Sequence, residues 1–126
     1  MDFKSATIGN KSVVKVTLGN LTIYPRDVFV VDPTFITVDN MSQIVEIVVT
    51  SVIGGNAADV TKTVRLDEIS MFDYGYITGS NIGERIYRFQ IPQNYDYNSS
   101  RHAQVQFTQN GTGQFYIVDI WQDEAM

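Results

Sequence analysis

The sequence predicts an all-β protein, an immunoglobulin-like antiparallel β-sandwich with an additional N-terminal β segment. Apolar and polar residues alternate with period two along most of the 126 residues, short apolar runs are separated by turn residues, and no stretch has a helical apolar stripe. The seven Tyr, seven Phe and one Trp, together with many Val, Ile and Thr, suit a pleated, half-buried surface. Because the chain has no cysteine, the sandwich must hold without a disulfide.

Glycine, asparagine and proline divide the first half of the chain into strands. The expected strands are Val13–Leu18, Leu21–Tyr24, Val28–Val31, Phe35–Val38 and Gln43–Ile53. Along the longest of them, Val45, Ile47 and Val49 share one face. A boundary at Asp32-Pro33 separates residues 1–33, an N-terminal β segment or docking arm, from residues 34–126, the sandwich itself.

The second half begins after the turn Gly54-Gly55-Asn56, whose residues tolerate positive φ. The expected strands are Val60–Leu66, Met71–Thr78, Glu84–Ile91, Arg101–Thr108 and Phe115–Trp121. The last two strands form a closing hairpin around a glycine turn at residues 110–113. Phe115–Trp121 is apolar on both faces apart from Asp119, which predicts a central strand covered on both sides.

The net charge of −5 argues against a nucleic-acid partner, since phosphate binding needs clustered Lys and Arg. The charge is unevenly spread: residues 1–31 hold four cations and two acids, whereas residues 32–126 hold five cations and twelve acids. Lys4, Lys11 and Lys15 make the first segment a candidate arm for docking on a shell or on a neighbouring copy. A random surface imbalance is the alternative.

The segment from Phe35 to Gln122 resembles the BACON family, the Bacteroidetes-associated carbohydrate-binding often N-terminal domains. The matching residues, in order, are Ile36-Thr37-Val38, Val45–Ser51, Gly79–Ile91, Asn94, Arg101-x-Ala103-x-Val105-x-Phe107-Thr108 and Gln122. The tryptophan usual in the middle of that domain has no clear counterpart here, and Phe72 or Tyr76 is the alternative at its place. On the residues themselves, Asn94 suits an Asx turn and Arg101 suits a forked brace for the loop between them.

The resemblance implies a cysteine-free immunoglobulin-like sandwich that acts without catalysis. Family members occur as modules of secreted glycan-active enzymes and in proteins of tailed phages that infect gut Bacteroidetes. We therefore expect a non-enzymatic structural protein, an auxiliary or decoration component of a bacteriophage capsid that also serves adhesion. Its partners would be capsid shell or other virion proteins, and surface glycans; a carbohydrate-binding module is the alternative function.

The start of the chain agrees with a virion location. Met1-Asp2-Phe3-Lys4 lacks the basic start and apolar core of a signal peptide, and no apolar run is long enough to span a bilayer. We expect no membrane partner. A secreted or cell-surface location is the alternative if a signal peptide was removed.

Two groups of aromatic residues are candidates for ligand or partner contact. Tyr95 and Tyr97 alternate in the loop before the closing hairpin, where exposed rings could stack on sugars; packing against the end of the sandwich is the alternative. Phe72, Tyr74 and Tyr76 share one face at period two. That pattern favours a core-facing stripe, with a binding platform at Tyr74 as the alternative.

Trp121 belongs to an outward row with Phe115 and Ile117 if the alternate residues of that strand face the core. Such a row indicates a protein contact surface, unless residues 1–31 fold back and cover it.

His102, the only histidine, has no nucleophile elbow beside it, and is expected to be solvated or at an interface. No spacing of carboxylates matches a calcium loop or a glycosidase pair. We expect no catalytic residue, no metal and no cofactor.

Overall fold

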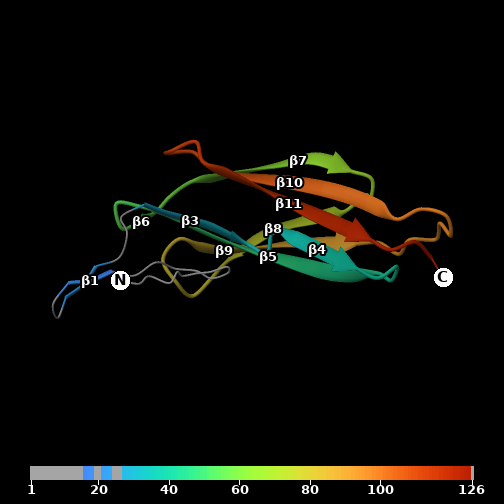
Figure 1. Cartoon of the computed structure of the whole chain (residues 1–126), viewed down its shortest axis with the longest axis horizontal. Helices are drawn as coiled ribbons and strands as arrows, with labels where there is room; N and C mark the ends of the chain where they lie inside the picture. Colours follow the sequence, from blue (N-terminus) through green and yellow to red (C-terminus); the bar gives the residue numbers. More distant parts are fainter. Residues whose placement is uncertain (1–15, 19–20, 24–26, 126) are drawn as a thin grey trace.

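The computed structural model describes residues 16–18, 21–23 and 27–125, which form a two-sheet β-sandwich preceded by a short hairpin (Figure 1). The strands of the hairpin are β1 (Val16–Leu18) and β2 (Leu21–Ile23). The strands of the sandwich are β3 (Asp27–Asp32), β4 (Phe35–Val38), β5 (Gln43–Ile53), β6 (Asn56–Ala57), β7 (Val60–Asp67), β8 (Phe72–Thr78), β9 (Glu84–Ile91), β10 (Arg101–Gln109) and β11 (Phe115–Gln122). No helix occurs in the described ranges, so none there is able to cross a membrane.

The strand order is that of an immunoglobulin sandwich. One sheet runs β3-β5-β9-β8, with β6 paired to the end of β5, and the other runs β4-β11-β10-β7. With β3 as strand A, these orders correspond to the ABED sheet and to a GFC sheet extended by a short first strand. The predicted all-β, disulfide-free, immunoglobulin-like sandwich is confirmed.

The chain changes sheets between β3 and β4. β3 pairs antiparallel with β5, and after two residues β4 pairs parallel with β11 in the opposite sheet. Both strands run toward the same end of the sandwich. β3 lies before the predicted boundary at residue 33, and it is an integral strand of the five-stranded sheet.

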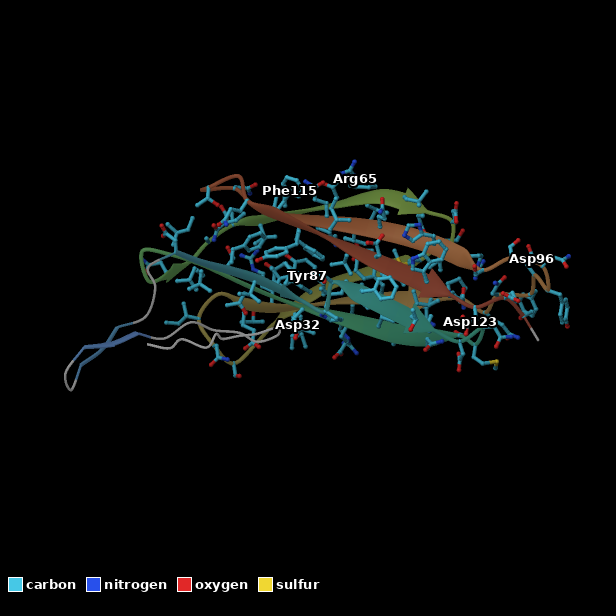
Figure 2. The ribbon with its side chains drawn as sticks, in the orientation of Figure 1. Asp32, Arg65, Tyr87, Asp96, Phe115 and Asp123 are labelled. Carbon is cyan, nitrogen blue, oxygen red and sulfur yellow. The ribbon has the colours of Figure 1, made fainter. Side chains whose placement is uncertain are left out.

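The core lies between the sheets and follows the period-two pattern. Inward-facing residues of the two sheets meet in it: Phe29, Val31, Val45, Ile47, Val49, Tyr87, Phe89, Ile91, Ala103, Val105, Phe107, Val118 and Ile120. In Figure 2, Tyr87 lies between the two layers. The expected alternation of Ala103, Val105 and Phe107 is confirmed, since all three side chains are fully buried.

The expectation that β11 is covered on both faces is wrong. The strand is central in its sheet, between β4 and β10. Val118 and Ile120 point into the core, but Phe115 and Trp121 on the other face are exposed. A strand whose residues are mostly apolar on both faces can therefore still have one face exposed to solvent.

The clearest backbone constraint in the fold is at Gly83, where the loop before β9 meets β5. Gly83 has a φ of +75°, and a Cβ built on it would lie 2.2 Å from the carbonyl oxygen of Ser51. The Ser51 amide donates to the Gly83 carbonyl at 3.0 Å, which holds the two backbones together. A side chain at residue 83 therefore meets both an unfavourable dihedral angle and a clash with backbone.

We predict that Gly83→Ala lowers the free energy of unfolding by more than about 2 kcal/mol, because the clash adds to the cost of a left-handed residue. Gly113→Ala is the matched control: its φ is +79°, but nothing lies within 4 Å of the added Cβ. The control should lose only about 1 kcal/mol. Urea unfolding of both variants measures the difference, and equal losses would show that the Ser51 contact is irrelevant.

Candidate functional site

The loop between β9 and β10, residues 92–100, is organised by one buried amide. Asn94 is 1% exposed, and its Nδ2 donates to the carbonyls of Ser99 and Asp123, both at 3.0 Å. Its Oδ1 accepts the Asp96 amide at 3.0 Å, which is the Asx turn expected from the sequence. Because a buried amide is costly to leave unpaired, these bonds fix the loop against the C-terminal tail.

Arg101 and Gln122 join the same region across the closing hairpin. The Arg101 Nε and Nη2 donate to the Gln122 Oε1 at 3.2 and 2.6 Å. The Pro92 carbonyl accepts from the Arg101 Nη2 at 3.1 Å and from the Gln122 Nε2 at 2.9 Å. The forked guanidinium thus braces the start of the loop, as expected, with the fully buried Gln122 as its partner.

Asp96 braces the outer part of the loop with hydrogen bonds. Its Oδ1 accepts the Asn98 amide at 2.8 Å, its Oδ2 accepts the Ser99 hydroxyl at 3.1 Å, and its carbonyl accepts the Ala125 amide at 2.8 Å. The hydrogen bonds from Asn98 and Ser99 favour the ionised form and lower the pKa of Asp96 below its usual range. The carboxylate therefore supports the loop in its charged form.

Tyr95 and Tyr97 are carried outward by this braced loop. Their exposed fractions are 75% and 69%, so neither packs against the end of the sandwich. The neighbouring loop between β4 and β5 is joined to them by the bond from the Asn94 amide to the Asn40 carbonyl at 2.8 Å. That loop adds Met41, which is 51% exposed. In Figure 2, Asp96 and Asp123 lie together at this end of the molecule.

A second candidate surface is the outer face of β4 and β11. We call Phe35, Phe115, Ile117 and Trp121 the outer apolar row; Phe35 is 61%, Phe115 55% and Trp121 36% exposed. The strands place these side chains on one face, because Phe35 pairs with Asp119 and Thr37 pairs with Trp121. The outward orientation expected from the sequence for Phe115, Ile117 and Trp121 is confirmed, and the structure adds Phe35 to the row.

His102 fixes Trp121 within this surface. The two rings are stacked, with centroids 4.0 Å apart and planes within 4°. The His102 Nε2 lies 2.8 Å from the Asp119 Oδ1, which also accepts the Gln104 Nε2 at 2.8 Å. The hydrogen bonds from Gln104 and then His102 lower the pKa of Asp119. His102 therefore positions an aromatic side chain at a surface.

The stripe of Phe72, Tyr74 and Tyr76 does not face the core, so that expectation is wrong. The three side chains are 61%, 54% and 48% exposed. A β-bulge lies between Asp73 and Tyr76, with Gly75 at a φ of +79°, and shifts the register against β9. Phe72 and Tyr74 contact each other edge to face, whereas Tyr76 contacts Tyr87. One inserted residue thus divides the stripe between two faces.

The remaining predicted contact residues, Lys4, Lys11 and Lys15, lie outside the described residues. Within the described ranges, no group of three or more His, Asp or Glu side chains is placed to hold a metal ion. The contacts of His102 are with a carboxylate and an indole, and they include no hydroxyl nucleophile.

Two polar positions of the fold were not singled out from the sequence. Gln109 is fully buried, and its Nε2 donates to the Ser51 Oγ at 2.7 Å while its Oε1 accepts the Thr112 hydroxyl at 2.8 Å. Both Gln109 and Ser51 continue the inward alternation of their strands, which is the signal that identifies them. Where the edge strands β7 and β8 of the two sheets meet, Lys62 of β7 forms an ion pair with Asp73 of β8 above the Tyr87 ring.

Comparison with protein-family models finds no match, and comparison with curated proteins finds none either. Among solved structures, the chain is similar to the ZirS C-terminal domain, with a TM-score of 0.49 and 13% sequence identity. The alignment covers 98% of this chain and 87% of that one. A likeness at this level implies nothing about function.

We predict that the Asp96 carboxyl titrates below the usual aspartate range. Because its pKa is lower in the folded protein than in the unfolded chain, the ionised carboxylate stabilises the loop above the ordinary value, and this contribution is lost as the pH falls through the lower, folded value. An NMR titration of the side chain measures it, and Ser99→Ala should move the pKa upward by removing one donor. A wild-type Asp96 that titrates at or above the usual value would contradict this account.

Proposed function

We propose that this protein is a non-enzymatic structural component of a larger protein assembly, which it joins through the outer apolar row. The carrying observation is that Phe35, Phe115 and Trp121 are exposed together on one sheet face. Large aromatic side chains gathered on a flat surface are typical of protein contacts, where they supply most of the binding energy.

The electrostatic contacts around the row support a recognition role. Trp121 is held by stacking on His102, so little side-chain freedom is lost when a partner covers it. Asp119, His102 and Gln104 form a hydrogen-bonded group beside it, and such polar groups at an interface fix the orientation of a partner. A preformed aromatic anchor beside polar groups suits the recognition of a protein partner.

The assembly we propose is the capsid of a bacteriophage, with the chain as an auxiliary or decoration protein located in the virion. This step depends on the BACON resemblance, whose marker residues hold the loop of residues 92–100. Asn94 bonds the Asp123 carbonyl of the tail, and Arg101 and Gln122 bond each other and the Pro92 carbonyl. The partner is then a shell protein, against which the row of β4 and β11 would pack.

We predict that Phe35→Ser combined with Phe115→Ser prevents binding to the assembled particle. Both side chains are more than half exposed, so the free energy of unfolding should change by less than about 1 kcal/mol. Ile82→Ser is the matched control, because Ile82 is 67% exposed in a loop outside the row. Co-sedimentation with purified particles of the phage that encodes the chain measures the binding. Undiminished binding by the double variant, or absence of the chain from virions by mass spectrometry, would reject the proposal.

A carbohydrate-binding module is the second candidate, and a different observation favours it. Tyr95 and Tyr97 are the two most exposed large hydrophobic side chains of the described residues, and the loop that carries them is braced by Asn94 and Asp96. Rigid, exposed rings lose little entropy when they stack on a sugar. Adhesion to surface glycans would then accompany the structural role.

For this second function, we predict that Tyr95→Ala combined with Tyr97→Ala abolishes signals on a glycan array and leaves the thermal melt unchanged. Ile82→Ala is the control, since Ile82 is 67% exposed and lies in the loop before β9, outside the loop of residues 92–100. Glycan binding that survives the loop variant would exclude the loop as the sugar site.

A further inference from the structure

Charge is strongly polarised along the sandwich. We define the tip as the end formed by the loops 39–42, 68–71 and 92–100 and the tail 123–125, together with the adjoining strand ends. Its carboxylates are Asp39, Asp67, Glu68, Asp96, Asp123 and Glu124, and its single cation is Arg101. The charge of these seven side chains, −5, is as large as the net charge of the whole chain.

The tip is also an apolar contact surface. Met41, Tyr95 and Tyr97 are all at least half exposed there, and they come from two loops joined by a backbone hydrogen bond. Arg101 is committed to Gln122 and Pro92, so its guanidinium is directed inward. A partner of the tip therefore meets aromatic rings surrounded by carboxylates, and a segment that combines cations with apolar residues is complementary to it.

The opposite end of the sandwich carries the start of the chain. Asp27 pairs with Ile53, and its carboxylate accepts the amide of Gly54 at 3.2 Å, so β3 begins beside the turn after β5. Figure 1 shows the β1–β2 hairpin at this end and the C-terminus at the other. Residues 1–26 hold four cations and one acid: Lys4, Lys11, Lys15 and Arg26 against Asp2. A basic segment thus precedes one end of an acidic-tipped body.

We propose that the tip of one copy binds the basic N-terminal segment, residues 1–26, of a second copy, so that the chains associate head to tail. The two contact surfaces differ, which makes the interface heterologous; such an interface generates rings if the rotation closes and filaments if it does not. Phe3, Ile8 and the valines of this segment would supply the apolar contacts for Met41, Tyr95 and Tyr97.

A second copy is the partner to which Lys15 and Arg26 can deliver their charge, because neither residue reaches the tip of its own chain. β3 and β4 together run twelve residues from Asp27 to Val38, about 40 Å along the sandwich. Lys15 precedes Val16, which pairs with Ile23, and the path from there to Asp27 is at most about 25 Å. Lys15 and Arg26 therefore remain far from the tip of their own chain, whereas a neighbouring tip can approach both.

This inference does not depend on the capsid role, since it uses the tip and not the outer apolar row. The test is sedimentation velocity of the full chain over a concentration series, at low and at raised salt. We expect the mass to grow with concentration and the association to weaken with salt, because exposed charge pairs are screened. A chain that remains monomeric up to its solubility limit, or whose association does not respond to salt, would overturn the inference.

Two charge variants identify the surfaces. Asp123→Lys with Glu124→Lys alters the tip, and Lys11→Glu with Lys15→Glu alters the N-terminal segment; each should lower the association constant at least about tenfold. Asp32→Lys with Asp59→Lys is the matched control, with the same change of charge at exposed positions outside the tip. If the control weakens association as much as the tip variant, net charge alone is responsible and the interface is not at the tip.

Mixing the two variants distinguishes this arrangement from a symmetric one. The tip variant keeps an intact N-terminal segment and the other keeps an intact tip, so the mixture should form a one-to-one complex that grows no further. A mixture that remains monomeric would contradict head-to-tail binding. Phe35→Ser with Phe115→Ser should self-associate normally; if it does not, the association belongs to the outer apolar row, and the inference fails independently of the capsid proposal.

Discussion

The hydrogen bonds among Arg101, Gln122 and the Pro92 carbonyl determine how one end of the sandwich is closed. Gln122 is fully buried at the end of β11, so its amide must be paired within the protein. Its oxygen accepts two donors of the guanidinium, and its nitrogen donates to Pro92. This arrangement fixes the register of the closing hairpin, in which Arg101 lies opposite Gln122, and it also fixes where the loop of residues 92–100 begins.

A second buried amide closes the other end of the same hairpin. Gln109 bonds Ser51 in the facing sheet and Thr112 in the turn. The core of Phe107, Val105 and Ala103 lies between these two polar ends. In a chain without cysteine, side-chain amides thus connect the two sheets and position both turns, a role that a disulfide has in other immunoglobulin-like domains.

The parts of the fold that follow the period-two rule were predictable, and those that depend on a single departure from it were not. The alternation of Ala103, Val105 and Phe107 identifies a core-facing strand. Side chains of a strand point to alternate faces, so once one face is buried every second residue must be apolar. The predicted orientation of the β8 stripe is wrong because Phe72 pairs with Gln90, on the face of β9 opposite the buried Phe89. The bulge at Gly75 then inserts one residue and places Tyr76 opposite Tyr87, which period counting cannot detect. Asn94 was identified as a loop organiser, but its bond to the Asp123 carbonyl joins residues 29 apart and requires the fold.

We infer that Asn94 holds the loop of residues 92–100 rigidly, so that Tyr95 and Tyr97 are presented in a fixed position. Native-state amide hydrogen exchange tests it most directly. In the wild-type protein the amides of Asp96 and Ala125, which bond Asn94 and Asp96, should be protected. In Asn94→Ala their protection should be lost while that of Val105 in β10 remains. Exchange of the wild-type Asp96 and Ala125 amides at the rate of an unfolded chain would contradict the claim.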